Sequence, residues 1–143
     1  SLDPGIAEWL FLQLGRPNLD LFATRYNHKL AVFVSPVPDP LAWEVDALSI
    51  SWEGLWAYAF PPRQILPQVL QKVRDTRVVR ILLIAPLWPS RPWFPLLRDL
   101  AIGDPVPLPA RRDLLRQPRS DRTLAQDELQ TLQLHAWLLE RGP

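Results

Sequence analysis

The stretch LWAYAFPPRQILPQVLQKVRDTRVVRILLIA, residues 55–85, decides the fold of this chain. Residues 55–60 are aromatic and apolar without a helical face, and the proline pair that follows them cannot continue a central strand. Apolar residues then recur at helical spacing over residues 65–73. Residues 78–85 form a run of Val, Ile and Leu, interrupted only by Arg80, that is typical of a strand buried on both faces. The stretch therefore predicts a strand, a helix and a second strand of an α/β fold.

Shorter segments on either side extend this unit. Asp3-Pro4 supplies an N-cap and a first-turn proline, so a helix is expected over residues 4–14. The other expected elements are strands over residues 19–23 and 31–34, a helix over residues 93–101, and a strand over residues 132–138, where apolar residues alternate. An α/β sandwich of this kind binds ligands just past the carboxyl ends of its parallel strands.

The composition predicts one globular domain, residues 1–143. Of the 143 residues, 48% are apolar and 22% are charged, which allows a single core, while seventeen prolines argue against a helical bundle. Sixteen basic and fifteen acidic side chains leave a formal charge of +1, so no bulk field indicates nucleic acid or a membrane. The absence of cysteine excludes disulfides, thiolate metal sites and a cysteine nucleophile.

Two further features of the sequence concern membrane association and the polypeptide to which the chain belongs. The longest apolar runs are far shorter than the ~20 residues that span a bilayer, so we expect a soluble protein with no membrane partner. The chain contains no methionine, which leads us to expect a segment of a longer polypeptide.

Two places past predicted strands are candidates for a site. Asp20 lies in an apolar strand, where a buried carboxylate either has a structural partner or binds the hydroxyls of a nucleoside. The Pro61-Pro62 pair either ends its strand or presents backbone carbonyls to an exocyclic amine, which requires an Asn or Asp side chain just before it. Phe60 stands at that preceding position and has no hydrogen-bonding group.

A set of motifs in fixed order carries a resemblance to a known family. The motifs are Asp20-Leu21-Phe22-Ala23-Thr24, Asn27, Asp46-Ala47-Leu48, Trp52 with Gly54, Tyr58-Ala59-Phe60-Pro61-Pro62, Ile81-Leu82-Leu83-Ile84-Ala85-Pro86 and Trp93-Phe94. Their order resembles that of phage-type DNA N6-adenine methyltransferases (Dam-like). The whole chain resembles the segment that follows reverse transcriptase and ribonuclease H in DIRS-type retrotransposon polyproteins, including Leu2-Asp3-Pro4-Gly5, Arg112-Asp113-Leu114-Leu115 and Leu134-His135-Ala136-Trp137-Leu138-Leu139.

The resemblance implies a Rossmann-like methyltransferase fold, with a mainly parallel sheet flanked by helices and a late antiparallel strand. It places Asp20 and Asn27 beside the pocket for S-adenosylmethionine, and it matches Asp46 to an acidic residue ahead of the catalytic strand. The glycine-rich turn common in such pockets is replaced by Ala23-Thr24-Arg25-Tyr26.

The same resemblance assigns the catalytic motif to Phe60-Pro61-Pro62-Arg63. In the family an Asn or Asp at the first position holds the adenine amino group, and an aromatic residue at the last position stacks on the extruded base. Phe60 cannot hold an amine, and Arg63 is not aromatic. We therefore expect a degenerate, catalytically inactive domain without a cofactor, which serves as a structural or nucleic-acid-contacting module. The alternative is an active S-adenosylmethionine-dependent DNA N6-adenine methyltransferase.

Arginine supplies fourteen of the sixteen basic residues, and residues 105–122 predict a Pro- and Arg-rich loop. Guanidinium groups suit phosphates, so nucleic-acid contacts are expected at Arg63, Arg111, Arg112, Arg116, Arg119 and Arg122. The resemblance also implies an intracellular protein, in the cytoplasm or nucleus, beside the reverse transcriptase and ribonuclease H domains of the same polyprotein.

A third interpretation groups Asp20, Asp39 and Asp46 as a metal-binding nuclease site of the ribonuclease H kind. No metal site is expected at His28 or His135, because neither has a carboxylate or cysteine at ligand spacing.

Trp9, Trp56 and Trp137 fall in predicted regular elements and are expected in the core. Trp88 and Trp93 instead flank residues 89–92 and are expected to form an exposed aromatic surface.

Overall fold

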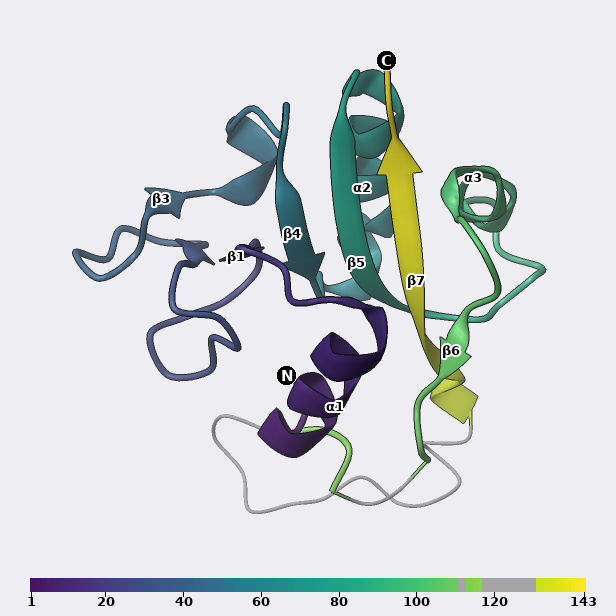
Figure 1. Ribbon diagram of the computed structural model, residues 1–143, viewed down its shortest axis with the longest axis horizontal. Helices are drawn as coiled ribbons and strands as arrows, with labels where there is room; N and C mark the ends of the chain where they lie inside the picture. Colours follow the sequence, from purple (N-terminus) through teal and green to yellow (C-terminus); the bar gives the residue numbers. More distant parts are fainter. Residues whose placement is uncertain (111–112, 117–130) are drawn as a thin grey trace.

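The structure, a computed structural model, describes residues 1–110, 113–116 and 131–143. Within these residues the main feature is a five-stranded sheet with the strand order β1-β4-β5-β7-β6 (Figure 1). In sheet order the strands are β1 (Leu19–Asp20), β4 (Trp56–Ala59), β5 (Val79–Pro86), β7 (Leu134–Arg141) and β6 (Val106–Pro107). β1, β4 and β5 are parallel, whereas β7 runs antiparallel to both of its neighbours.

β5 is the centre of the sheet because it is apolar on both faces. All of its side chains are buried except that of Arg80, which is half-buried. It pairs with β7 along its whole length, from Val79 opposite Arg141 to Pro86 opposite Leu134. The alternation that predicts a late strand is thus confirmed, although the strand begins and ends slightly later than expected.

Three α-helices that lie entirely within the described residues accompany the sheet: α1 (Pro4–Leu14), α2 (Leu66–Asp75) and α3 (Phe94–Leu100). α1 begins as predicted, because the Asp3 carboxylate accepts hydrogen bonds from the backbone N–H groups of Gly5 and Ile6, at 3.0 and 3.3 Å. It ends at Gly15, whose φ of 103° favours glycine.

The helices divide between the two faces of the sheet (Figure 1). α2 and α3 contribute to a core that includes Ile81 and Leu83 of β5. α1 contributes to a second core with Leu82 and Ile84, which point the other way because successive strand residues alternate between faces. This alternation explains why β5 requires a continuous apolar run.

The segment between β1 and β4 contains no α-helix. Its regular elements are β2 (Val34–Ser35), β3 (Glu44–Val45) and the 3-10 turn η1 (Ala47–Ser49), and β2 and β3 form a separate parallel pair. A single bridge between Asp20 and Phe33 connects this pair to β1.

The expectation of a Rossmann-like methyltransferase fold is wrong. The sheet is mixed, only β1, β4 and β5 form its adjacent parallel strands, and a second small sheet replaces a helical crossover between β1 and β4. A doubly wound sheet requires repeated strand–helix–strand units, whereas here only α2 links two neighbouring parallel strands.

The two strands expected nearest the amino terminus also differ from those in the structure. The strand predicted over residues 19–23 stops after Asp20, and the one predicted over residues 31–34 is displaced to Val34–Ser35. β3 and β6 were not predicted, because each has two residues and shows no hydrophobic period. None of the helices in the described ranges is long and apolar enough to cross a bilayer.

Candidate ligand-binding site

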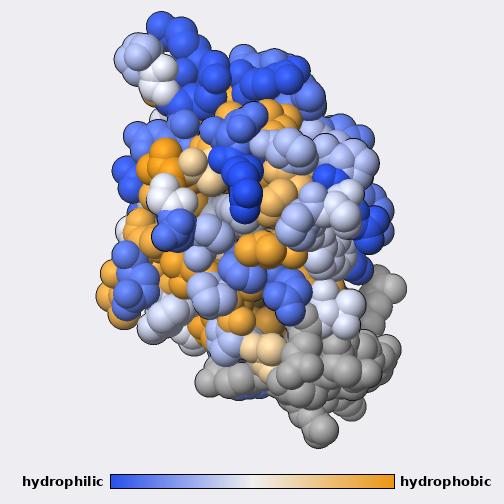
Figure 2. Space-filling view, turned by 90° about the vertical axis from the view of Figure 1, so that its right-hand side faces the viewer, coloured by the Kyte–Doolittle hydropathy of each residue, from blue (hydrophilic) through white to orange (hydrophobic). Residues whose placement is uncertain are grey.

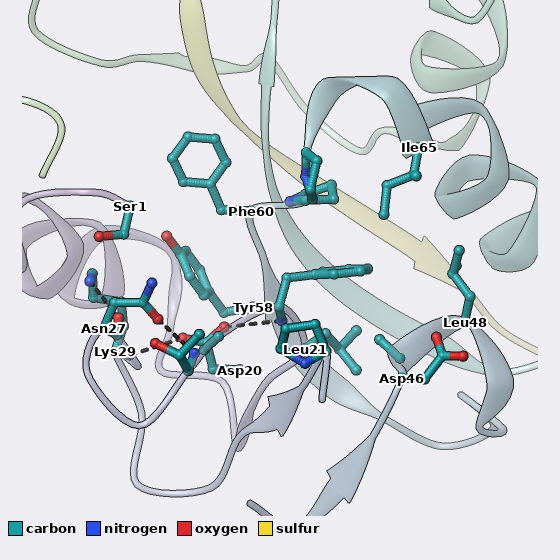
Figure 3. A pocket seen from close by; sticks show the side chains of 17 residues that line it. Ser1, Asp20, Leu21, Asn27, Lys29, Asp46, Leu48, Tyr58, Phe60 and Ile65 are labelled. Atoms are coloured by element: carbon teal, nitrogen blue, oxygen red, sulfur yellow. Dashed lines mark hydrogen bonds between the residues drawn. The ribbon is translucent and has the colours of Figure 1, made fainter. Parts of the chain in front are cut away.

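A cavity of about 460 Å³ opens at the carboxyl ends of β1 and β4 (Figure 3). Asp20, Asn27 and Lys29 lie together at one end of it, and Asp46 and Leu48 lie at the other (Figure 3). Aromatic and proline side chains form much of the remaining wall: Phe22, Tyr58, Phe60, Pro61 and Pro62. The volume is in the range of cavities that bind small organic ligands.

Asp20 is the most buried ionisable group of this cavity, with 1% of its surface exposed. One carboxylate oxygen accepts a hydrogen bond from the backbone N–H of Phe22 at 3.4 Å, and the other accepts one from the backbone N–H of Lys29 at 2.9 Å. Burial raises the pKa of Asp20 to about 6, although these hydrogen bonds and the charges of Lys29 and His28 lower it in part. Asp20 therefore has local structural partners, as its first interpretation predicts, and also faces the cavity.

Tyr58 is a cavity residue that the sequence did not single out. It lies opposite Asp20 in the register of β1 and β4, and its ring packs edge-on against Phe11 at 5.6 Å. Its side chain is buried, with 2% of the residue surface exposed. Burial, with the charge of Asp20, raises the pKa of Tyr58 well above its ordinary value. Strand register could have revealed its place at the cavity, because the pairing of β1 with β4 puts Tyr58 opposite Asp20. Without the register, an aromatic residue in a strand indicates only a position in the core.

The loop after β1 closes on itself through Asn27. The Asn27 side-chain oxygen accepts from the Thr24 backbone N–H at 2.7 Å, and the Thr24 carbonyl accepts from the N–H groups of Asn27 and His28 at 3.2 Å. The Lys29 ammonium donates to the Asn27 carbonyl at 2.7 Å, and burial lowers the pKa of Lys29. Asn27 thus holds a turn rather than presenting its amide oxygen to the cavity.

Asp46 lies at the opposite end of the cavity on an exposed turn. Its φ of 61° is in the left-handed region, and its backbone N–H donates to the Ser35 carbonyl at 2.8 Å. Its carboxylate makes no hydrogen bond to the residues the structure describes. Asp20 and Asp46 therefore line one cavity in different environments.

The segment assigned to the catalytic motif forms the wall between these two ends. Phe60 is half-buried and packs against the core that contains α1. Pro61 is buried, and Pro62 precedes a 3-10 turn, η2 (Arg63–Ile65). Arg63 is exposed and lies over the ring of Trp88, with its Cζ 5.5 Å from the ring centroid. Phe60 therefore presents hydrocarbon where the resemblance expects a hydrogen-bonding side chain.

Most of the expected arginine contacts cannot be placed. Arg111, Arg112, Arg119 and Arg122 lie outside the described residues. Arg116 pairs with Asp3, where its hydrogen bond lowers the pKa of that carboxyl, so it connects the 113–116 segment to the start of α1. The Arg116 backbone also hydrogen bonds with Ser1, which lines the cavity, so this segment lies beside the cavity.

The carboxylates of the nuclease alternative do not assemble. Asp39 forms an ion pair with Arg25 at 2.7 Å instead of joining Asp20 and Asp46 at the cavity. In the part of the chain that the structure describes, no three His, Asp or Glu side chains are grouped closely enough to hold a metal ion. His28 stacks on Phe33 at 4.5 Å.

The polar groups of the cavity do not fit S-adenosylmethionine, the cofactor that the resemblance implies. Backbone N–H groups at the end of a strand commonly bind the anionic parts of such ligands, but those of residues 22–24 and 26–29 all hydrogen bond within the protein. The cofactor also carries two cationic groups, whereas Lys29 adds positive charge beside Asp20. No step through this cofactor follows from the geometry.

Comparisons with known proteins assign no family to this arrangement. No protein-family model matches the chain, and no curated protein is significantly similar to it.

Proposed function

We propose that this chain is a degenerate methyltransferase-like module of a retrotransposon polyprotein, which transfers no methyl group and acts as a structural and nucleic-acid-contacting domain. In this proposal the module is retained in the cytoplasm or nucleus beside reverse transcriptase and ribonuclease H. It rests on the resemblance of the motifs and on the chemistry of the cavity, and it does not require a Rossmann fold.

The observation that carries the proposal is the side chain of Phe60. Asp20, Asn27, Asp46 and the proline pair of the motif line the same cavity as Phe60. A phenyl ring can neither accept a hydrogen bond from an adenine amino group nor take its proton. Because this ring packs against the core beneath it, it also cannot move aside without exposing apolar surface.

The nucleic-acid part of the proposal has separate support. Arg63 follows the proline pair directly, is exposed, and makes no ion pair within the described residues. A guanidinium in this position suits a phosphate better than it suits the base-stacking role of the aromatic residue that it replaces.

A methyl-transfer assay tests the catalytic part of the proposal. The chain, produced in a host without adenine methyltransferases, is incubated with methyl-labelled S-adenosylmethionine and a duplex DNA that contains all sequence contexts of adenine. We expect no label in the DNA above a protein-free control, even with the chain in excess.

The alternative, an active adenine methyltransferase, predicts incorporation of label into the DNA. Incorporation that Asp20→Ala abolishes would overturn the proposal, because that variant removes a cavity carboxylate and leaves any contaminating enzyme unaffected.

A further inference from the structure

Two loops that leave neighbouring strands bring two arginines to the same tryptophan. Arg63 follows β4, while Trp88 and Arg91 follow β5. The Cζ atoms of Arg63 and Arg91 lie 5.5 and 4.8 Å from the centroid of the Trp88 ring. Both distances are within the range of cation–π contacts, which hold a guanidinium in place without using its N–H donors on a protein acceptor.

The tryptophan at the centre of this cluster is fixed by hydrogen bonds. Its indole N–H donates to the Thr131 carbonyl at 3.0 Å, and its own carbonyl accepts from the backbone N–H of Arg91 at 3.0 Å. Trp88 is half-buried. The loop between β5 and α3 projects at the right of Figure 1, on the side that faces the viewer in Figure 2.

The two guanidinium groups also lack the partners that other arginines have. Arg16, Arg25 and Arg116 each pair with a carboxylate. Arg63 and Arg91 are exposed, and neither forms an ion pair in residues 1–110, 113–116 or 131–143. Their N–H donors are therefore available to a ligand from outside the protein.

We infer that the Arg63–Trp88–Arg91 cluster is a contact site for single-stranded nucleic acid, which rests on the nucleic-acid contact of the proposed function and gives it a location. Guanidinium groups donate in pairs to phosphate oxygens, and guanidinium planes and indole rings stack on unpaired bases. A single strand presents a phosphate and an accessible base face within one nucleotide, whereas a duplex keeps its base faces stacked.

Fluorescence anisotropy with labelled 12-nucleotide single strands of DNA and RNA, and with the DNA duplex, tests the inference over a range of salt concentrations. Arg63→Gln/Arg91→Gln is compared with wild type. Each phosphate contact on a single strand adds about 0.7 to the slope of log K against log salt, so we expect a slope shallower by about 1.4. Affinity at low salt should fall roughly tenfold or more.

A matched control removes two arginines at the other end of the sheet. Arg74→Gln/Arg77→Gln makes the same change in charge, at the end of α2 and just before β5, and both side chains are exposed. This variant should retain the wild-type slope. Arg63→Lys/Arg91→Lys keeps both charges but loses the planar groups, so it should retain most of the slope and bind more weakly.

The outcomes separate the inference from the proposed function. If wild type binds single strands and Arg63→Gln/Arg91→Gln keeps its slope, the site is wrong while the nucleic-acid contact stands. Tighter binding of the duplex than of either single strand would also overturn the site. If wild type binds no nucleic acid, both fail. Equal affinity for the DNA and RNA single strands fits the inference, because both present phosphates and unpaired bases.

Discussion

Asp20 is a buried carboxylate that forms local hydrogen bonds, but these bonds do not offset its loss of solvation. Its two oxygens accept from backbone N–H groups, yet burial outweighs these bonds and raises its pKa to about 6. The same side chain faces Lys29, His28 and the hydroxyl-bearing Tyr58. A carboxyl group in this state is protonated more easily in the folded chain than in the unfolded one.

This difference predicts a pH-dependent stability. Between about pH 4 and pH 6, Asp20 is protonated in the folded chain but ionised in the unfolded chain. Its contribution to the free energy of unfolding is therefore present at low pH and is lost as the pH rises through 6. Asp20→Asn does not titrate. The unfolding free energy of wild type minus that of Asp20→Asn, from urea denaturation, should fall by about 2 kcal/mol between pH 4 and pH 7.

Other carboxyl groups titrate in both proteins and cancel in this difference. A difference that stays constant across the range would contradict the assigned burial of Asp20.

The sequence was sufficient to interpret Phe60 of the candidate site, but it was not sufficient to identify Tyr58. The loss of a hydrogen-bonding group at Phe60 follows from the residue type alone. The position of Tyr58 at the cavity depends on strand register, and the contact of Arg63 with Trp88 depends on two loops that meet only in the folded chain. Such juxtapositions have no local pattern to predict them.

At the scale of elements, the clearest predictions came from local signals at helix ends and from long apolar runs. Asp3-Pro4 and Gly15 correctly bounded α1, and β4, α2 and β5 form the predicted unit. β1, by contrast, ends where the Asp20 carboxylate accepts from the next residues and turns the chain. Strands of two residues are held by long-range pairing and leave too short a pattern to recognise.

The N-cap of α1 gives a prediction at this scale. Asp3→Ala removes the acceptor for the Gly5 and Ile6 N–H groups and also the partner of Arg116, so it should lower the unfolding free energy by about 1 to 2 kcal/mol in urea denaturation.

Asp3→Asn is the matched control, because asparagine also caps helices but removes the negative charge. It should lose less than half as much stability as Asp3→Ala, since the Arg116 side chain is 62% exposed and its ion pair is weak. Equal losses in the two variants would show that the ion pair, and not the cap, stabilises this end of the helix.

At the scale of the whole molecule, the mixture of helices and strands could be predicted, but the predicted Rossmann-like fold was wrong. Period and composition indicated helices and strands in one α/β domain, but the strand order and the second sheet depend on pairings between segments far apart in sequence. The Rossmann-like expectation failed in the segment between β1 and β4, because residues there form short strands and turns in place of a crossover helix.

The cavity nevertheless lies where an α/β sheet commonly binds ligands, past the carboxyl ends of parallel strands. What distinguishes it is its chemistry. The N–H groups of residues 22–24 and 26–29 are occupied, an aromatic ring replaces the expected amide or carboxylate, and the available arginines lie outside it near Trp88. Binding is therefore expected at the surface beside the cavity, and no catalysis is expected in its interior.

Isothermal titration of the folded chain with S-adenosylmethionine distinguishes an inactive module from a working methyltransferase, because a working methyltransferase must bind this cofactor. We expect no saturable heat from the wild-type chain at millimolar cofactor, with folding checked by circular dichroism in the same sample. Saturable binding that Asp20→Ala abolishes would contradict this expectation and restore the cavity as a cofactor site.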